Sequence, residues 1–360
     1  MNIDRQDVEA AVTGGAILGG GGGGWVEEGR ILGRLALEKG FSEILSIDDI
    51  PDTSTLLTVS AVGAPSAGAS LLRPEDYVRA VELFMERTAI KVGGLISSEI
   101  GALGVVNGWL QSAALDIPVV DAPCNGRAHP LGLMGSMGLA QKKDYLASQA
   151  AVGGSLERGN RVESFFTGPL SEVSKKVRES AVRAGGMVAV ARNPVPCSYV
   201  KEHGAPGAIR MALDAGKRFL EKTVRQDRAE EAIERILSFL GGTFIGKGII
   251  EKYALKMEAG LDAGQADLRE GTTVHELTFW NEYMTLEGRG KRIATFPDLI
   301  MTFDAQTGRP LTSAELRGAH EVLVIVVPAR KLILGAGMRD HHLLRIVEKT
   351  IGKSMGEFGS

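Results

Sequence analysis

The segment from residue 121 to residue 130 places five chemically different groups within ten residues. It contains a carboxylate, a thiol, an amide, a guanidinium and an imidazole, from Asp121, Cys124, Asn125, Arg127 and His129. The segment overlaps the end of an apolar stretch at 117–123, which predicts a strand of a parallel sheet. Open α/β sheets bind ligands at the carboxyl ends of such strands. We therefore expect a site here; the alternative is a structural turn in which Arg127 and Asp121 satisfy each other.

The side chains in this segment have possible catalytic or binding roles, and each also has a purely structural explanation. His129 could act as a general base oriented by Asp121, although a lone histidine is more often structural. Cys124 could be a nucleophile if Arg127 or a helix start stabilises its thiolate, and a buried inert cysteine fits equally well. Arg127 presents a planar donor fork that suits a carboxylate or a polarised carbonyl. The expected substrate contacts of this segment are Asn125 and Gly126.

The sequence leaves open whether this site binds a divalent metal. Asp121, His129 and another cleft residue could hold one and activate a water molecule. The six histidines are scattered and show neither an HxH nor an HExxH spacing, so the metal signal is weak.

The glycine run at residues 19–24 could be a backbone loop for an anion. It does not follow a strand, and no Lys-Ser or Lys-Thr comes after it, so no nucleotide cofactor is expected. It precedes a predicted helix at Val26, whose positive end lies nearby. The alternative is a tight helix crossing. In the anion-binding interpretation, the amides that hold an anion or oxyanion belong to Gly21, Gly22, Gly23 and Gly24.

Further polar side chains end or interrupt apolar strands. Glu99 ends a predicted strand at the same sheet edge as Asp121, as an acid or base or as the counter-ion of Arg127, and Asn107 is expected to face the same cleft. The alternative for Glu99 is a solvated loop. In the second half of the chain, polar residues inside apolar strands either face solvent or reach into an interdomain cleft. These residues are Asn281, Glu282 and Asp298.

The elements that must position these groups alternate in the first part of the chain. Helices are predicted at 5–18, from 26 to 40, at 73–88 and at 104–116, and strands at 55–62, 90–97 and 117–123. This alternation predicts a parallel-sheet α/β domain over residues 1–165. In residues 166–354 we expect helices at 170–186, 206–224 and 228–240 and a strand at 187–195. Short strands after Gly241 should pair antiparallel, as a sandwich or small barrel.

Composition limits the class of protein. With 360 residues, 44% hydrophobic and 24% charged, the chain is expected to form two packed domains. A net charge of −3 gives no field to attract nucleic acid or acidic membranes, and no secretory signal or membrane span is readable. Two cysteines cannot form a disulfide framework, which favours a reducing, cytoplasmic compartment. The expected partner is a small-molecule substrate, and a homo-oligomer remains open.

Several of these motifs occur together in one known family. They are Gly19–Gly24, Ser98-Glu99 with Asn107, Asp121 with Gly126-Arg-Ala-x-Pro130, Asn281-Glu282, and Pro297–Ile300 with Asp304 and Thr307-Gly308. In this order, over about residues 5–330, the chain resembles the S-methyl thiohydantoin desulfurase family. The resemblance implies an N-terminal α/β domain and a β-rich C-terminal domain. It also implies activity on sulfur-bearing hydantoin rings, releasing sulfide and leaving a hydantoin.

Three hypotheses follow. The preferred one is a hydrolase of a small cyclic amide or thioamide, which needs a base, a positioned water and an oxyanion cradle. His129 or Glu99 would be the base, and Arg127 would bind a ring carbonyl or a substrate carboxylate. The second is a binding or regulatory protein that senses a cyclic metabolite without turnover. The third is a ring isomerase or racemase with Cys124 as the proton carrier.

Overall fold

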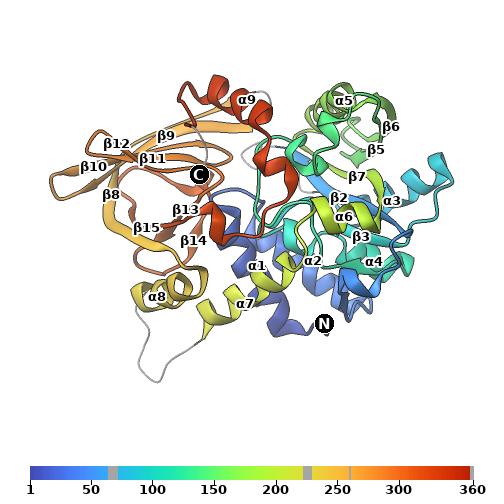
Figure 1. The fold of residues 1–360 in the computed structure, drawn as a ribbon, viewed down its shortest axis with the longest axis horizontal. Helices are drawn as coiled ribbons and strands as arrows, with labels where there is room; N and C mark the ends of the chain where they lie inside the picture. The colour runs from blue at the N-terminus through green and yellow to red at the C-terminus, as the bar shows by residue number, and fades with distance from the viewer. Residues whose placement is uncertain (64–71, 222–228, 259–260, 357–360) are drawn as a thin grey trace.

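The computed structural model describes residues 1–63, 72–221, 229–258 and 261–356. Within these residues the chain forms two β-sheets, and the first is covered by helices (Figure 1). The first sheet lies on the right of Figure 1 and the second on the left, with helix α1 (Arg5–Gly19) between them. The predicted fold class, an α/β part followed by a β-rich part with helices, is confirmed.

The first sheet is mixed. Its seven strands are β1 (Ile44–Leu45), β2 (Thr55–Gly63), β3 (Gly94–Ser97), β4 (Val119–Val120), β5 (Leu146–Gly153), β6 (Val162–Pro169) and β7 (Met187–Pro196). They lie in the order β1-β4-β3-β2-β7-β5-β6. The first four pair in parallel, as the alternation of strands and helices predicted, whereas β2 with β7, β7 with β5, and β5 with β6 pair antiparallel.

This mixed pairing corrects the expectation of a wholly parallel first sheet. β5 and β6 were not predicted, and their short connection requires an antiparallel hairpin, since parallel neighbours need a long crossover. The strand predicted at 187–195, assigned above to the second part of the chain, lies in the first sheet beside β2. Residues on both sides of position 165 therefore share one sheet.

Helices cover both faces of the first sheet. Besides α1 they are α2 (Val26–Glu38), α3 (Pro74–Thr88), α4 (Trp109–Leu115), α5 (Leu170–Arg183) and α6 (Cys197–His203). On one face, Val59 of β2 shares a core with Phe84 of α3. On the other face, Val190 of β7 packs with Val177 of α5. Alternate residues of a strand point to opposite faces, so β2, covered on both, is apolar along most of its length.

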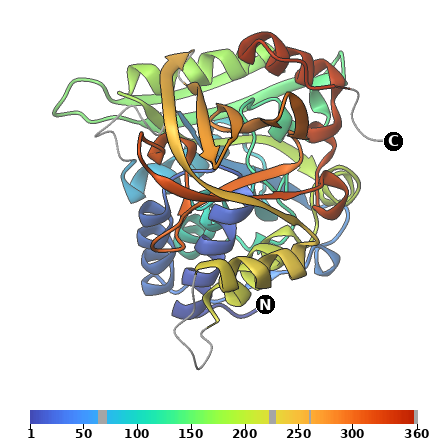
Figure 2. The ribbon, with the colours of Figure 1, turned by 90° about the vertical axis from the view of Figure 1, so that its left-hand side faces the viewer.

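The second sheet is antiparallel throughout. Its eight strands are β8 (Thr243–Glu258), β9 (Leu261–Glu270), β10 (Thr273–Trp280), β11 (Glu282–Gly288), β12 (Lys291–Thr295), β13 (Leu299–Asp304), β14 (Pro310–Leu311) and β15 (Glu321–Val327). Their order is β12-β11-β10-β9-β8-β15-β13-β14, and Figure 2 looks onto this sheet. β11 also contacts β13, which is not its neighbour in the sheet. The sheet thus curls around its own core, which includes Leu277, Phe279 and Val324.

Three further helices complete the described chain. They are α7 (Ala208–Leu220), α8 (Ala229–Leu240) and α9 (His341–Ile351). α7 and α1 cross closely: a Cβ atom on Gly14 would lie 1.8 Å from a backbone oxygen of α7, and one on Gly216 would lie 1.7 Å from a backbone oxygen of α1. Asp4 caps α1, since its carboxylate accepts hydrogen bonds from two amides of the first turn. This packing anchors the glycine run that follows α1.

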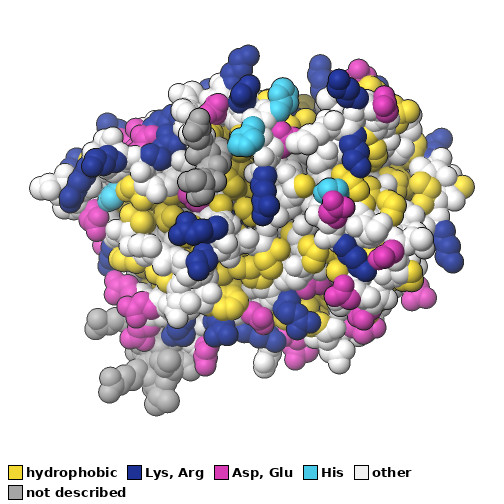
Figure 3. All heavy atoms as spheres, viewed as in Figure 1, with side chains coloured by type: hydrophobic (Ala, Val, Ile, Leu, Met, Phe, Trp, Pro, Cys, Tyr) yellow, Lys and Arg dark blue, Asp and Glu magenta, His cyan; other side chains and the backbone are white. Residues whose placement is uncertain are grey.

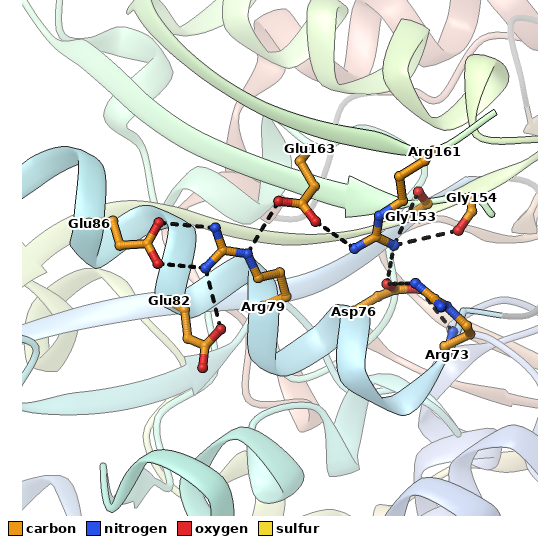
Figure 4. A network of polar contacts seen from close by, with 9 residues as sticks. All are labelled: Arg73, Asp76, Arg79, Glu82, Glu86, Gly153, Gly154, Arg161 and Glu163. Atoms are coloured by element: carbon orange, nitrogen blue, oxygen red, sulfur yellow. Dashed lines mark hydrogen bonds and ion pairs between the residues drawn. The ribbon is translucent and has the colours of Figure 1, made fainter. Parts of the chain in front are cut away.

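A chain of ion pairs ties α3 to the β5–β6 hairpin (Figure 4). Arg79 on α3 donates to Glu86 at 2.6 and 3.0 Å and to Glu163 of β6 at 3.2 Å. Arg161 joins Glu163 to Asp76 near the start of α3. Most of these side chains are partly exposed, so solvent screening keeps the contribution of the exposed pairs to stability small.

The surface shows no strong segregation of charge on the face in view. Basic and acidic side chains are interspersed with polar and apolar ones there (Figure 3). Across the ranges that the structure describes, no helix combines the length and the apolar character needed to cross a bilayer.

Candidate active site

A cavity of about 110 Å³ is lined by residues from both sheets. A single water needs roughly 10–15 Å³ on this measure, so the space suits a small ring compound. Its walls come from the glycine run, the carboxyl ends of β2 and β3, one face of α5, and the tip between β10 and β11. The predicted site residues that line it are Gly21, Gly22, Gly23, Gly24, Glu99, Asn107, His129, Asn281 and Glu282.

The glycine loop is held open to the cavity by its own conformation. Gly21, Gly23 and Gly24 have φ angles of 92°, 81° and 87°, a left-handed region that other residues rarely adopt. The second sheet holds the loop through a hydrogen bond, because the amide of Tyr283 donates to the Gly20 carbonyl at 2.8 Å. A Cβ atom on Gly22 would lie only 2.0 Å from Glu282 Oε1. The run therefore packs closely against neighbouring segments and also forms part of the cavity wall.

Glu99 lies just after the end of β3, at the predicted sheet edge. Burial raises the pKa of its carboxyl from 4.5 to about 7, against the lowering effect of the His129 amide, Arg192 and Arg127. The side chain is 22% exposed, so it remains open to the cavity. Asn107 lines the same wall, and its Oδ1 accepts a hydrogen bond from Gln111 at 2.9 Å.

His129 contacts Glu99 directly but is not its ionic partner. Its backbone amide donates to Glu99 Oε2 at 3.3 Å, and its Nε2 lies 3.3 Å from the same oxygen. Burial, with the nearby Arg192 charge, lowers the pKa of the imidazole to about 3, so the ring is neutral. Neither ring nitrogen has a hydrogen-bonding partner within the described residues. A base with so low a pKa accepts protons poorly, which makes Glu99 the better candidate for a general base.

Glu282 reaches the cavity from the second sheet. Trp280 of β10 pairs directly with Glu282 of β11, so Asn281 alone forms the tip between the strands, with φ of 56°. Asn281 is held there because its Oδ1 accepts from the Asp262 amide at 2.9 Å. Glu282 is 2% exposed, and burial, together with the charge of Glu99, raises the pKa of its carboxyl well above 4.5. Burial therefore favours the protonated form of this carboxyl.

Arg192 is a cavity residue that sequence reasoning missed. It lies on β7, is 3% exposed, and donates to Ser98 Oγ at 2.9 Å. In the sequence, Arg192 is recognisable as the single charged residue inside the apolar run Met187–Val195. Because this strand was assigned to the second part of the chain, Arg192 was not expected near Glu99.

Three of the predicted catalytic residues, Asp121, Cys124 and Arg127, lie away from the cavity wall. Asp121 accepts hydrogen bonds from the Ile209 and Arg210 amides at 2.7 and 3.2 Å, which satisfies the amino-terminal end of α7. Cys124 is fully buried beside Thr58, with 3.4 Å between Sγ and Oγ1, and burial raises the pKa of its thiol to about 11. A thiol with this pKa is a poor nucleophile at neutral pH.

Arg127, the third predicted catalytic residue outside the cavity wall, joins the two halves of the molecule. Arg127 is fully buried, stacks on Phe296 with 4.7 Å to the ring centre, and donates to the carbonyls of Pro297 and Asp298. Burial lowers its pKa to about 10, against the opposing charges of Glu282, Asp298 and Glu99. Its role is to hold the second sheet behind the glycine loop and to act on the cavity through its charge.

The remaining three residues pack rather than face the cavity. Asn125 donates to the Met134 carbonyl at 3.0 Å, and Asp298 accepts from the Ala329 amide at 2.7 Å. A Cβ atom on Gly126 would lie 1.9 Å from the carbonyl oxygen of Ile333. The glycine thus permits close backbone packing instead of contact with a ligand.

The predicted metal ligands do not form a binding set. Asp121 is occupied by α7, His129 faces Glu99, and no three His, Cys, Asp or Glu side chains converge suitably in the part of the chain that the structure describes. We therefore derive no step through a metal.

Comparison with known proteins agrees with this architecture. A crystal structure of a protein from Chromobacterium violaceum is similar over 100% of this chain and 99% of that chain, with a TM-score of 0.74 and 20% identity. At this identity the likeness shows the fold alone. No curated protein matches. Two family models match, described as the S-Me-THD-like N-terminal domain over residues 6–155 and the S-Me-THD-like C-terminal domain over residues 170–337. The chain belongs to the S-Me-THD-like family.

Proposed function

We propose that this protein is a hydrolase that replaces the exocyclic sulfur of a thiohydantoin-type ring with oxygen. One observation carries the proposal: two carboxyl groups with raised pKa values, Glu99 and Glu282, enter one cavity from the two sheets. Groups whose environments separate their pKa values suit the roles of base and acid. The family match supports the choice of ring.

The reaction begins with water held next to Glu99. The ionised carboxylate takes a proton from the water, whose oxygen attacks the ring carbon that bears sulfur. The electrons of the carbon–sulfur double bond move to sulfur, and protonated Glu282 donates its proton there. The carbon–oxygen double bond then forms as the carbon–sulfur bond breaks. The hydroxyl proton returns to Glu282, hydrosulfide leaves, and Glu99 releases its proton to solvent.

The remaining cavity residues support this scheme. Neutral His129 contacts Glu99 without competing for its proton. The glycine loop and the start of α2 would supply backbone amides that hold a carbonyl oxygen of the ring. The same loop leaves no room for Glu282 to turn away, because Gly22 packs against its carboxyl.

Sulfide release tests the proposal. The purified protein is incubated with thiohydantoins, S-methyl thiohydantoins and hydantoins, and released sulfide or thiol is measured. We expect turnover of a sulfur-bearing ring, and a loss of about 100-fold or more in kcat for Glu99→Gln and for Glu282→Gln. Glu157→Gln, in the exposed β5–β6 turn, is the matched control. Stabilisation by a ring compound without turnover would favour the metabolite-binding alternative and reject the hydrolase.

A further inference from the structure

Arg192 carries a buried charge that has no carboxylate within ion-pair distance among the described residues, although the charge of Glu99 acts on it from further away. Only 3% of its surface is exposed, and its guanidinium donates a hydrogen bond to the neutral Ser98 hydroxyl. Its Nε has no partner, and no carboxylate forms an ion pair with it in the described parts of the chain. Burying an unpaired guanidinium costs free energy, so the protein would be more stable with an apolar side chain here. The cost implies an anion that binds during function.

The backbone aims Arg192 at the cavity. Thr58 of β2 pairs with Arg192, whereas Leu57 faces both Asn193 and Pro194, which is a β-bulge in β7. Bulges commonly turn a side chain toward a site. Asn193 has φ of 52° and is 1% exposed, a conformation that persists only when its surroundings impose it. Here Gln149 Nε2 donates to Asn193 Oδ1 at 3.3 Å.

The surroundings of Arg192 suit a small anion. Ser60 also lines the cavity, is 6% exposed, and its Oγ has no hydrogen-bonding partner. A Cβ atom on Gly132 would lie 3.3 Å from Arg192 Nη1 and 3.3 Å from Ser174 Oγ, so the missing side chain leaves the guanidinium accessible from the α5 side. A cation and a free hydroxyl thus meet on one wall.

We infer that Arg192, with the Ser60 hydroxyl, binds the sulfur atom as it becomes negative, and that Asn193 is a positioning residue that directs Arg192. The catalytic part of this inference rests on the proposed function. When water attacks the ring carbon, the charge that moves to sulfur forms beside a guanidinium that is already desolvated, where its attraction is strongest. The departing hydrosulfide then has a matching cation in the cavity.

The first test compares Arg192→Met with Arg192→Lys, and Arg183→Met on the exposed side of α5 is the control. We expect Arg192→Met to lower kcat by about 100-fold or more while KM changes by less than about threefold. Arg192→Lys keeps the charge and should retain part of the activity. The melting temperature of Arg192→Met should equal or exceed that of the wild type. Turnover within about threefold of the wild type, or a clear loss of thermal stability, would overturn the inference.

A second measurement does not depend on turnover. Thiocyanate, a soft monovalent anion that lacks the hydantoin ring, is titrated while the melting temperature is followed. It should stabilise the wild type and Arg183→Met but not Arg192→Met; equal stabilisation of all three would reject the anion site. If the wild type releases no sulfide from any ring, the proposed function fails, and the thiocyanate result still decides the role of Arg192.

The positioning role of Asn193 has its own pair of variants. Asn193→Gly keeps access to the left-handed backbone and should retain thiocyanate binding and kcat within about threefold. Asn193→Val cannot adopt this conformation without strain and should lose both, with KM less affected. Equal behaviour of the two variants would show that the bulge does not direct Arg192.

Discussion

The raised pKa of Glu99 makes a prediction about stability that needs no substrate. The perturbation is Glu99→Gln, which keeps the shape of the side chain and removes its titration. A change of pKa from 4.5 to about 7 corresponds to about 3 kcal/mol, at about 1.36 kcal/mol per pKa unit. Because the side chain is 22% exposed, water in the cavity should reduce this to about 1–2 kcal/mol.

The sign follows from the protons that each state binds. Below about pH 4.5 Glu99 is protonated in both the folded and the unfolded chain, and well above pH 7 it is ionised in both. Between these values the folded protein keeps a proton that the unfolded chain has lost. The stability that this proton provides is complete below pH 4.5 and is lost as the pH rises through about 7. Glu99→Gln should therefore gain stability relative to the wild type over this range.

The assay is unfolding by urea at several pH values from about 4.5 to about 8, with the wild type, Glu99→Gln and Glu157→Gln in parallel. The free energy of unfolding of Glu99→Gln minus that of the wild type should rise by about 1–2 kcal/mol with pH. The control, with an exposed carboxyl, should show no such change. A difference for Glu99→Gln that stays constant with pH would refute the burial argument and remove Glu99 as a tuned base.

Three further substitutions separate cavity residues from structural ones. Gly22→Ala would place Cβ 2.0 Å from Glu282 Oε1 and should lower kcat at least about tenfold in the sulfide assay. Gly318→Ala, the control, has open space around it and should leave kcat unchanged. Equal turnover of the two variants would show that the contact between Gly22 and Glu282 does not matter for catalysis. Asp121→Ala should lower the free energy of unfolding by about 1–2 kcal/mol in urea, with kcat within about threefold; lost turnover at full stability would restore it as catalytic. Cys124→Ser should keep sulfide release within about threefold, and inactivity with intact folding would revive a thiol mechanism.

Local patterns in the sequence predicted most of the elements. The helices at α1, α3, α5, α7 and α8 follow from caps, prolines and apolar periodicity, and these features act within a few residues of each other. The sheet edge that carries Glu99 followed from the alternation of strands and helices, since parallel strands end at a common edge. The cavity residues Glu282 and Asn281 were recognisable as polar residues inside apolar strands.

The sequence could not decide which polar groups face the cavity. The segment richest in polar groups contributes three residues that do not line the cavity. Asp121 satisfies the start of α7, Cys124 is buried beside Thr58, and Arg127 joins the two halves of the molecule. Their partners lie far away along the chain, and only folding brings them within hydrogen-bonding distance. Side-chain chemistry alone does not distinguish a catalytic group from a satisfied one.

The sequence by itself determined the fold class, the family resemblance and the sheet edge where the cavity lies, because these depend on patterns of neighbouring residues. The tertiary structure alone decided that β7 crosses into the first sheet and brings Arg192 to the cavity. It also decided that Glu99 and Glu282 share one desolvated space, where the charge of Glu99 raises the proton affinity of Glu282. The pKa of a carboxyl depends on burial and on charges from distant segments, which no local pattern encodes.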